Sequence, residues 1–188
     1  MAVRRRALES GARPTTGALE PLPDALLQRP LDYLSAAHLR HRCMHAEMRT
    51  IAESGRCSRE AAERLIAFLT REVPLHHRDE DDDIFPSVLR RSVPEDGLEP
   101  VLRLLSSEHH LSERQATRIV EALGGDGDRD PIEIAPRVAE LLTTFARREH
   151  RHLAIENGIV LVIARKRLKR ADLEAITHSM RMRRGVNA

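Results

Sequence analysis

Aromatic residues are scarce in this sequence of 188 residues: they make up 2% of it, with no Trp, one Tyr and three Phe. The strands of sandwiches and barrels depend on aromatic and β-branched side chains, so this scarcity argues against an all-β fold. Long apolar runs are also missing, and none approaches the roughly 18 residues that a membrane-spanning helix needs. The formal net charge of +2 is too small to indicate a nucleic-acid partner.

Cysteine is nearly absent too. The two that occur, Cys43 and Cys57, lack the C-x-x-C spacing of redox and metal motifs, which predicts idle reduced thiols. The N-terminal segment is basic but has no apolar stretch typical of a secretory signal, so we expect a cytoplasmic protein. Arginine supplies every basic residue except Lys166 and Lys169, which suggests a GC-rich bacterial genome.

The rest of the composition, 41% hydrophobic and 32% charged residues, fits Leu- and Ala-rich helices around one core. Apolar residues at helical spacing predict four long helices with short connections, which makes neighbouring helices antiparallel. We expect an all-α, up-down four-helix bundle at 24–170, a flexible tail at 1–23, and a short C-terminal helix and tail at 171–188. The four helices are expected at 24 or 30 to 53, 58 to 91, 98 to 123, and 131 or 136 to 167.

Single residues mark the helix ends. Ser58 is a predicted N-cap, because its hydroxyl can accept a hydrogen bond from the first turn. Pro74 falls within the second helix and should kink or split it. Asp130 and Pro131 have the pattern of an N-cap and a first helical residue, although Pro136 indicates that the straight part of the last helix begins there.

Histidine is abundant, with ten in the chain. At about 100° per residue, each long helix places at least one of them on its apolar face. These inward-facing candidates are His38, His41 and His45, then His76 or His77, then His109, and finally His152. Glu80 and Glu156 lie on the same faces, and Glu is almost never buried unless it is paired or binds a metal. The converging side chains predict a metal site, with His110, His150 and His178 left at the surface.

Two segments, 76–80 and 152–156, share the pattern H-x-x-x-E, which is typical of a weak internal repeat. Residues i and i+4 lie one above the other on a helix, about 6 Å apart, so both can reach one ion or two adjacent ions. This spacing favours His76 over His77, because the residue four positions after His77 is Asp81, which is expected to point outward.

The donor types indicate which metal. A structural zinc has four ligands, usually including Cys, and neither Cys fits. Six or more nitrogen and oxygen ligands suit a pair of six-coordinate first-row ions bridged by carboxylates, and iron is favoured. Ferritin-like di-iron bundles use Glu-x-x-His instead. By analogy, a pair of irons richer in nitrogen favours the binding of O₂, NO or peroxide.

Four motifs follow one another along the chain: Pro30-Leu31-Asp32-Tyr33-Leu34 leading to His38, His76-x-x-x-Glu80 before Ile84-Phe85-Pro86, Ser107-Glu108-His109, and His152-x-x-x-Glu156-Asn157. Together they resemble the HHE cation-binding domains of the hemerythrin family, over about residues 30–163. The resemblance implies an oxo- or hydroxo-bridged di-iron centre. The implied terminal ligands are His38, His76, His109 and His152, and the implied bridges are Glu80 and Glu156. The resemblance selects His38, whereas the helical wheel alone favours His41.

The chain departs from the oxygen-carrying members of that family at the third helix. Those proteins have a fifth His one turn from the first, where this chain has Glu113 after His109 and Leu105 before it. The departure counts against reversible O₂ carriage more than against metal binding. Glu113 and Glu149 are also candidates to accept a hydrogen bond from an imidazole, or are simply surface charges. A further ligand is either absent or comes from His41, His45, His77 or Glu113.

We therefore expect a binding or sensing module, a di-iron protein that takes up O₂, NO or iron itself. The alternative is an enzyme that reduces peroxide or NO at an open coordination position, or an iron donor in iron–sulfur repair. A third hypothesis is a structural bundle that pairs its buried His and Glu with each other. We expect no nucleic-acid or membrane partner. The acidic run 79–83 should be a solvated face, and Ile159 and Ile163 should lie in the core.

Overall fold

The structure, a computed structural model, describes residues 21–125 and 129–186. The tail expected at 1–23 lies outside these residues, apart from 21–23. In chain order the elements are η2 (Asp24–Gln28), α1 (Pro30–Ser54), β1 (Arg56–Cys57), α2 (Arg59–Ala67), η3 (Phe68–Glu72), α3 (Val73–Arg78), η4 (Asp79–Ile84), α4 (Phe85–Arg91), η5 (Pro94–Asp96), α5 (Leu98–Gly124), β2 (Ile132–Glu133), α6 (Pro136–Ile155), η6 (Glu156–Val160), α7 (Leu161–Arg167) and α8 (Arg170–Arg183).

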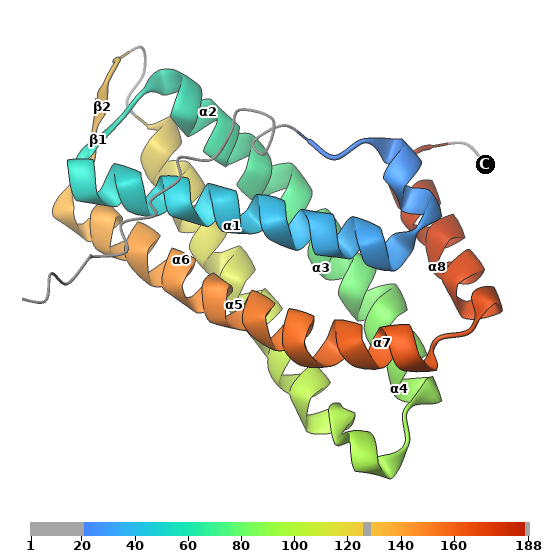
Figure 1. Ribbon diagram of the computed structural model, residues 1–188. Coiled ribbons are helices and arrows are strands. Elements are labelled where there is room, and N and C mark those ends of the chain that lie inside the picture. The colour runs from blue at the N-terminus through green and yellow to red at the C-terminus, as the bar shows by residue number, and fades with distance from the viewer. Residues whose placement is uncertain (1–20, 126–128, 187–188) are drawn as a thin grey trace, which may run out of the picture.

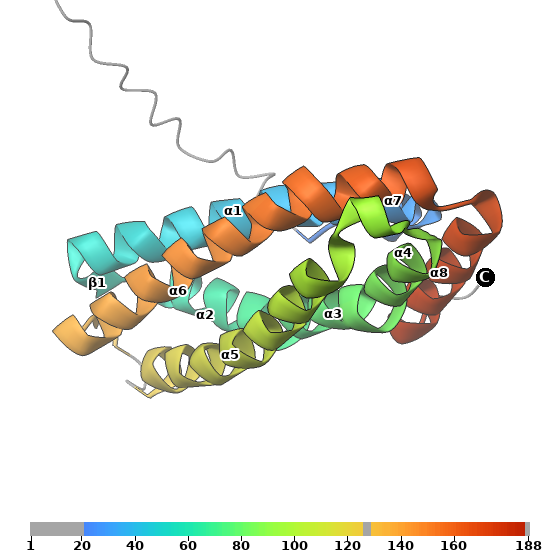
Figure 2. The ribbon, with the colours of Figure 1, turned by 90° about the horizontal axis from the view of Figure 1, so that it is seen from below.

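These elements form four long rods: the first rod is α1, the second runs from α2 to α4, the third is α5, and the fourth runs from α6 to α7. Successive rods are antiparallel (Figure 1). Seen from below, the first and fourth rods lie side by side, and the second lies beside the third (Figure 2). The short helix α8 lies at the end of the bundle where α1 begins. The expected all-α bundle with an extra C-terminal helix is thus confirmed. None of the described helices combines the length and the hydropathy that crossing a membrane requires.

The opposite end of the bundle differs in part from the expectation. Ser58 is the N-cap of α2, as predicted, and its hydroxyl accepts a hydrogen bond from the Ala61 N–H at 3.2 Å. Asp130 is not the N-cap of the last helix, which begins at Pro136. Its carboxylate instead accepts a hydrogen bond from the Arg59 N–H at 3.1 Å, in the first turn of α2. The residues after it form β2, which pairs with β1 in a two-residue ladder too short to leave a sequence pattern.

Three π-helical turns, η3, η4 and η6, interrupt the second and fourth rods. Two of them come just before a proline: η3 before Pro74 and η4 before Pro86. Proline has no N–H and its ring crowds the carbonyl four residues earlier, so the helix widens rather than continuing straight. The break expected at Pro74 is confirmed in this form. The third turn contains Gly158, which lowers helix propensity.

The π turn η6 changes which residues of the fourth rod face the core. A π turn contains one residue more than an α turn, so it rotates the following residues by about 100° relative to a straight helix. The core position predicted at Ile159 is therefore wrong, whereas Ile163 packs against the cluster at the α8 end but is only partly buried. Ile159 is 38% exposed and Ile163 is half-buried, while Val160 and Ala164, one residue further on, are buried.

The apolar core consists of two clusters separated along the bundle axis. One cluster lies toward the β1–β2 end and includes the fully buried Phe68 and Phe145. The other lies toward α8 and includes Leu34, Ile84 and Leu105. On every rod the residues between the two clusters include a buried histidine. The bundle therefore has a polar layer at one depth, enclosed by apolar side chains on both sides.

Candidate metal centre

The polar layer brings together all six of the side chains predicted as metal ligands. Each rod supplies one imidazole, and the second and fourth rods each add a carboxylate one turn later. None of the six is more than 4% exposed. We name this set the His/Glu cluster, and it consists of His38, His76, Glu80, His109, His152 and Glu156.

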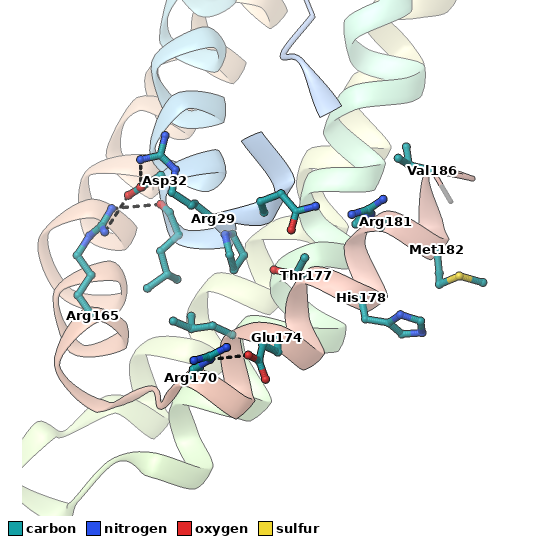
Figure 3. Close-up of a pocket in the computed structure, with 14 residues that line it drawn as sticks. Arg29, Asp32, Arg165, Arg170, Glu174, Thr177, His178, Arg181, Met182 and Val186 are labelled. Carbon is teal, nitrogen blue, oxygen red and sulfur yellow. Dashed lines mark hydrogen bonds and ion pairs between the residues drawn. The ribbon is translucent and has the colours of Figure 1, made fainter. Parts of the chain in front are cut away.

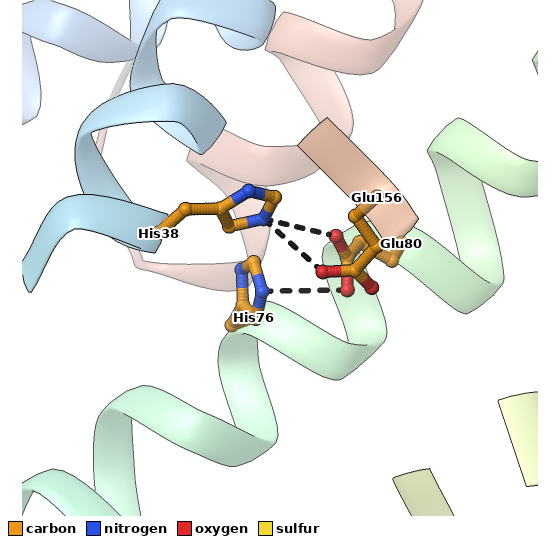
Figure 4. Close-up of side chains that lie close together, drawn as sticks. All are labelled: His38, His76, Glu80 and Glu156. Carbon is orange, nitrogen blue, oxygen red and sulfur yellow. Dashed lines mark hydrogen bonds and ion pairs between the residues drawn. The ribbon is translucent and has the colours of Figure 1, made fainter. Parts of the chain in front are cut away.

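The first half of the cluster is formed by His38 and His76 with the two carboxylates (Figure 4). The Nε2 atom of His38 lies 3.4 Å from Oε1 of Glu80 and 3.5 Å from Oε2 of Glu156. The Nε2 atom of His76 lies 3.4 Å from Oε2 of Glu80. Four donor atoms from three rods therefore surround one point.

The second half is formed by His109 and His152 with the same two carboxylates. The Nε2 atom of His152 lies 2.7 Å from Oε1 of Glu156, and that of His109 lies 3.4 Å from Oε2 of Glu80. The two Nε2 atoms face each other at 3.1 Å. Within each half, the donor atoms all lie within 4.8 Å of one another, and Glu80 and Glu156 belong to both halves. The cluster thus offers two adjacent cation positions joined by two shared carboxylates.

The unpaired polar atoms of the cluster fit a metal. Among the described residues, Nε2 of His76, Oε2 of Glu80 and both carboxylate oxygens of Glu156 are buried and make no contact with hydrogen-bond geometry. Buried polar atoms without partners are costly, by about 1–3 kcal/mol each. Donors about 2.1 Å from one ion lie about 3.0 Å apart when they subtend a right angle, and slightly further apart at wider angles. Most of the separations between donors in the cluster are of this size, so an ion at each position would satisfy atoms that the protein leaves unpaired.

Protons on the imidazoles balance the carboxylates when no metal is present. Burial raises the pKa of Glu80, but the imidazoles beside it, first His76 and then His109 and His38, outweigh burial and hold that pKa well below its usual range. Burial lowers the pKa of His109, yet its hydrogen bonds, first to Asp81, raise it to about 12. The Glu156 carboxylate overcomes burial in the same way and raises the pKa of His152 to about 9. The cluster therefore attracts positive charge, and metal binding should release protons from it.

Two carboxylates outside the cluster orient the second pair of imidazoles. The Nδ1–H group of His109 donates to Asp81 at 2.7 Å, and that of His152 donates to Glu108 at 3.0 Å. Each bond keeps the proton on Nδ1 and leaves the lone pair of Nε2 pointing into the cluster. A metal needs this tautomer of the imidazole. The expectation that Asp81 points outward is wrong, because η4 turns its side chain toward the third rod. Glu108 was missed because it follows no spacing rule: it precedes His109 in sequence but serves a histidine on another rod.

The other candidate ligands are buried nearby but do not join the cluster. His41 packs edge-on against Phe68, with ring centres 4.8 Å apart, and burial holds its pKa well below the usual range. His45 packs against Phe145, and burial lowers its pKa to about 3. His77 stacks on His109 at 4.1 Å. Among the described residues, neither group of possible ligands includes His41, His45, His77 or Glu113.

Of the two glutamates considered as imidazole partners, Glu113 lies beside the imidazole of His77, outside the cluster, and Glu149 accepts a hydrogen bond from an arginine. The side chain of Glu113 is 48% exposed, and its Oε1 atom lies 3.6 Å from Nδ1 of His77. Glu149 is buried, accepts a hydrogen bond from Arg148 at 3.1 Å, and has a pKa that burial raises. The surface histidines are as expected: His110, His150 and His178 are all exposed.

The acidic run 79–83 is not the solvated face that its composition predicts. Asp79 is completely buried and accepts hydrogen bonds from Arg183 and Arg184 of α8, at distances of 2.5 to 2.9 Å. Asp83 also pairs with Arg183, at 2.8 Å. The basic C-terminal residues therefore neutralise the acidic run of the second rod, which fixes α8 beside the residue that precedes Glu80.

Of two cavities in the described part of the chain, only the smaller touches the cluster. The larger, about 570 Å³, is an open groove between the start of α1 and α8 (Figure 3). Its arginines are paired with carboxylates, Arg165 with Asp32 at 3.0 Å and Arg170 with Glu174 at 2.7 Å. The smaller cavity, about 80 Å³, is lined by His76 and so touches the cluster. The volume of a cavity is thus a poor guide to the chemistry here.

Comparison with protein families agrees with the geometry. The profile of the family described as Hemerythrin HHE cation binding domain matches residues 29–164. The matched span contains the first three rods and the fourth as far as residue 164, but not α8. The chain therefore belongs to the hemerythrin HHE cation-binding family, and its buried His/Glu cluster fits a metal site. Comparison with curated proteins and with solved structures found no match.

Proposed function

We propose that the protein holds two iron ions, joined by an oxo or hydroxo bridge, in the His/Glu cluster. The observation that carries this proposal is that two groups of four ligands share both of their carboxylates. A single ion could not engage both groups, and a structural zinc would need only four ligands. The abundance of imidazole and carboxylate and the absence of cysteine from both groups favour iron over zinc or copper.

We assign the ligands by their place in the two halves. His38 and His76 would be terminal ligands of one iron, His109 and His152 would be terminal ligands of the other, and Glu80 and Glu156 would be shared by the two, as they are by the two ligand groups. Bound iron would supply reversible redox chemistry and affinity for a small ligand. The chain itself keeps bulk water out through the two apolar clusters. Residues 24–170 form the proposed metal-binding unit, and 171–188 form an appended helix and tail.

We propose O₂, NO or iron itself as the physiological ligand, in a binding or sensing role. The third rod carries one cluster histidine rather than two, since Glu113 faces His77 and not the cluster. With two imidazoles, two carboxylate oxygens and the bridge, each iron would have five ligands, so a sixth coordination position should stay open. An open position also favours the second candidate function, an enzyme that reduces peroxide or NO, and an iron donor in iron–sulfur repair would need one as well.

Metal analysis with optical spectra of the oxidised and reduced protein tests the proposal. We expect about two irons per chain and oxo-to-iron charge-transfer bands in the oxidised state that are lost on reduction. A colourless protein with one tightly held zinc would contradict it. Anaerobic addition of peroxide or NO to the reduced protein separates the two roles: catalytic turnover favours the enzyme, whereas stoichiometric binding without turnover favours the binding module.

A further inference from the structure

A small cavity among the described residues borders the cluster at His76. Its volume of about 80 Å³ is well above the roughly 15 Å³ that one water molecule needs, so it has room for a ligand of two or three atoms. The first and second rods supply most of its wall, and Arg184, the C-cap residue of α8, also contributes to it. The wall residues used below are Tyr33, Arg40, His41, Glu72, His76 and Arg184.

Arg40 gives this cavity a fixed hydrogen-bond donor. Its guanidinium donates two bonds to Glu72, from Nε at 2.5 Å and from Nη2 at 2.7 Å, which lock the side chain in place. Arg40 is only 5% exposed, and within the described chain its Nη1 group is buried with no hydrogen-bond partner. A buried guanidinium with a spare N–H group is suited to a ligand that carries an acceptor atom, above all an anion.

Arg184 brings α8 to the cavity. The side chain is held in two ways: it donates two hydrogen bonds to the buried Asp79, and its guanidinium lies over the ring of Tyr33, 5.0 Å from the ring centre. Arg183 shares the bond to Asp79 but is not among the residues that line the cavity. The structure thus separates two roles of α8, docking on the acidic run and lining the cavity, and only Arg184 has both.

We propose that this cavity is the entrance by which a small inorganic anion, or a neutral ligand of two or three atoms, reaches the metal centre, and that Arg184 of α8 is its gate. The inference rests on the proposed function, because it assumes a metal at the cluster. Arg40 attracts the anion with its spare N–H group, and His76 forms the inner end of the passage. Movement of Arg184 away from Tyr33 opens the outer end, which makes α8, outside the family match, a control element for access.

The test measures the rate of azide binding to the full-length, iron-loaded protein by stopped-flow absorbance. Arg184→Ala and Tyr33→Ala each remove one side of the gate and should raise the association rate at least fivefold. Arg183→Ala keeps the cavity wall but loses a bond to Asp79, and Arg170→Ala removes an exposed arginine of the same helix. These two controls should stay within twofold of wild type. Arg40→Gln should slow azide at least threefold but leave the association rate of neutral NO within twofold.

Iron content and thermal unfolding are measured for every variant, so that a misfolded protein is not mistaken for an open gate. Equal acceleration in Arg183→Ala and Arg184→Ala would show that loose docking of α8 is the cause, and would overturn the gate. Unchanged azide rates in both Arg184→Ala and Tyr33→Ala would overturn the entrance while leaving the iron proposal intact. A wild-type protein that takes up no iron would overturn the proposed function, and this inference with it, before any variant is made.

Discussion

Replacing a shared carboxylate should have a larger effect on metal content than replacing a histidine of one half. Glu156 belongs to both ligand groups, so Glu156→Ala removes a donor from each cation position. His38 belongs to the first group alone. We therefore expect Glu156→Ala to lose both irons and His38→Ala to lose about one of the two.

The effect on stability follows from mass action. Free metal at 100 times its dissociation constant stabilises the folded state by about 2.7 kcal/mol per site, or about 5 kcal/mol for two sites. In a chain of this size 1 kcal/mol shifts Tm by about 2–4 °C. Iron should then raise the Tm of the wild type by about 10–20 °C and that of His38→Ala by about half as much. The Tm of Glu156→Ala should hardly change.

Asp172→Ala provides the matched control. Asp172 is also a buried carboxylate, with hydrogen bonds from Arg91 at 2.8 and 3.0 Å, but it lies in α8, outside both ligand groups. This variant should lose stability yet keep two irons per chain. The assay is iron per chain after desalting, with calorimetric unfolding before and after anaerobic addition of Fe(II). Wild-type iron content in Glu156→Ala, or equal iron content in His38→Ala and Glu156→Ala, would refute the reasoning.

Three further predictions concern residues outside the cluster. Asp81→Asn and Glu108→Gln each deprive one imidazole of its carboxylate acceptor and should lower iron affinity by about 10–100-fold; competition with a chelator measures this, and wild-type affinity would contradict it. His45 is neutral when folded, with a pKa lowered to about 3, whereas the unfolded chain binds its proton below about pH 6.5. Its contribution is thus complete above pH 6.5 and is lost as pH falls toward 3, so the metal-free wild type should lose about 2 kcal/mol more than His45→Leu between pH 6.5 and 5. Urea unfolding at the two pH values tests this, and parallel losses would argue against it. Ser58→Ala removes the N-cap of α2 and should cost about 1 kcal/mol in urea unfolding without loss of iron, since Ser58 lies at the far end of its rod; any loss of iron would count against this separation.

Five of the six cluster residues, all except His38, could be found from the sequence because each depends on spacing within one helix. A histidine on an apolar face, with a glutamate four residues later, defines both the face and the depth of the site. In a bundle of antiparallel rods of similar length, such residues meet when they lie at the same distance from the ends. The choice between His38 and His41 could not be made in this way, because both are buried on the same rod.

Contacts between rods could not be predicted. Asp81 and Glu108 each serve a histidine on a neighbouring rod, and the rotation of one helix against another leaves no trace in a single sequence. The π turns could not be predicted from the sequence either. One extra residue in η6 moved the core positions from Ile159 to Val160, and a helical wheel assumes that no such residue exists.

The burial of the acidic run 79–83 could not be predicted either, because it depends on charges from another helix. Five consecutive acidic residues suggest a solvated surface when only their own helix is considered. Asp79 is instead buried under two arginines from a helix about 100 residues later in the chain. A buried carboxylate is tolerable only with such partners, so its environment depends on where α8 docks.

Anomalous diffraction at the iron absorption edge, from crystals of the iron-loaded protein, tests the central claim most directly. The account predicts two iron peaks a few ångströms apart, one between His38 and His76 and the other between His109 and His152, with Glu80 and Glu156 in contact with both. A single peak, a peak elsewhere in the bundle, or no iron at the polar layer would contradict it.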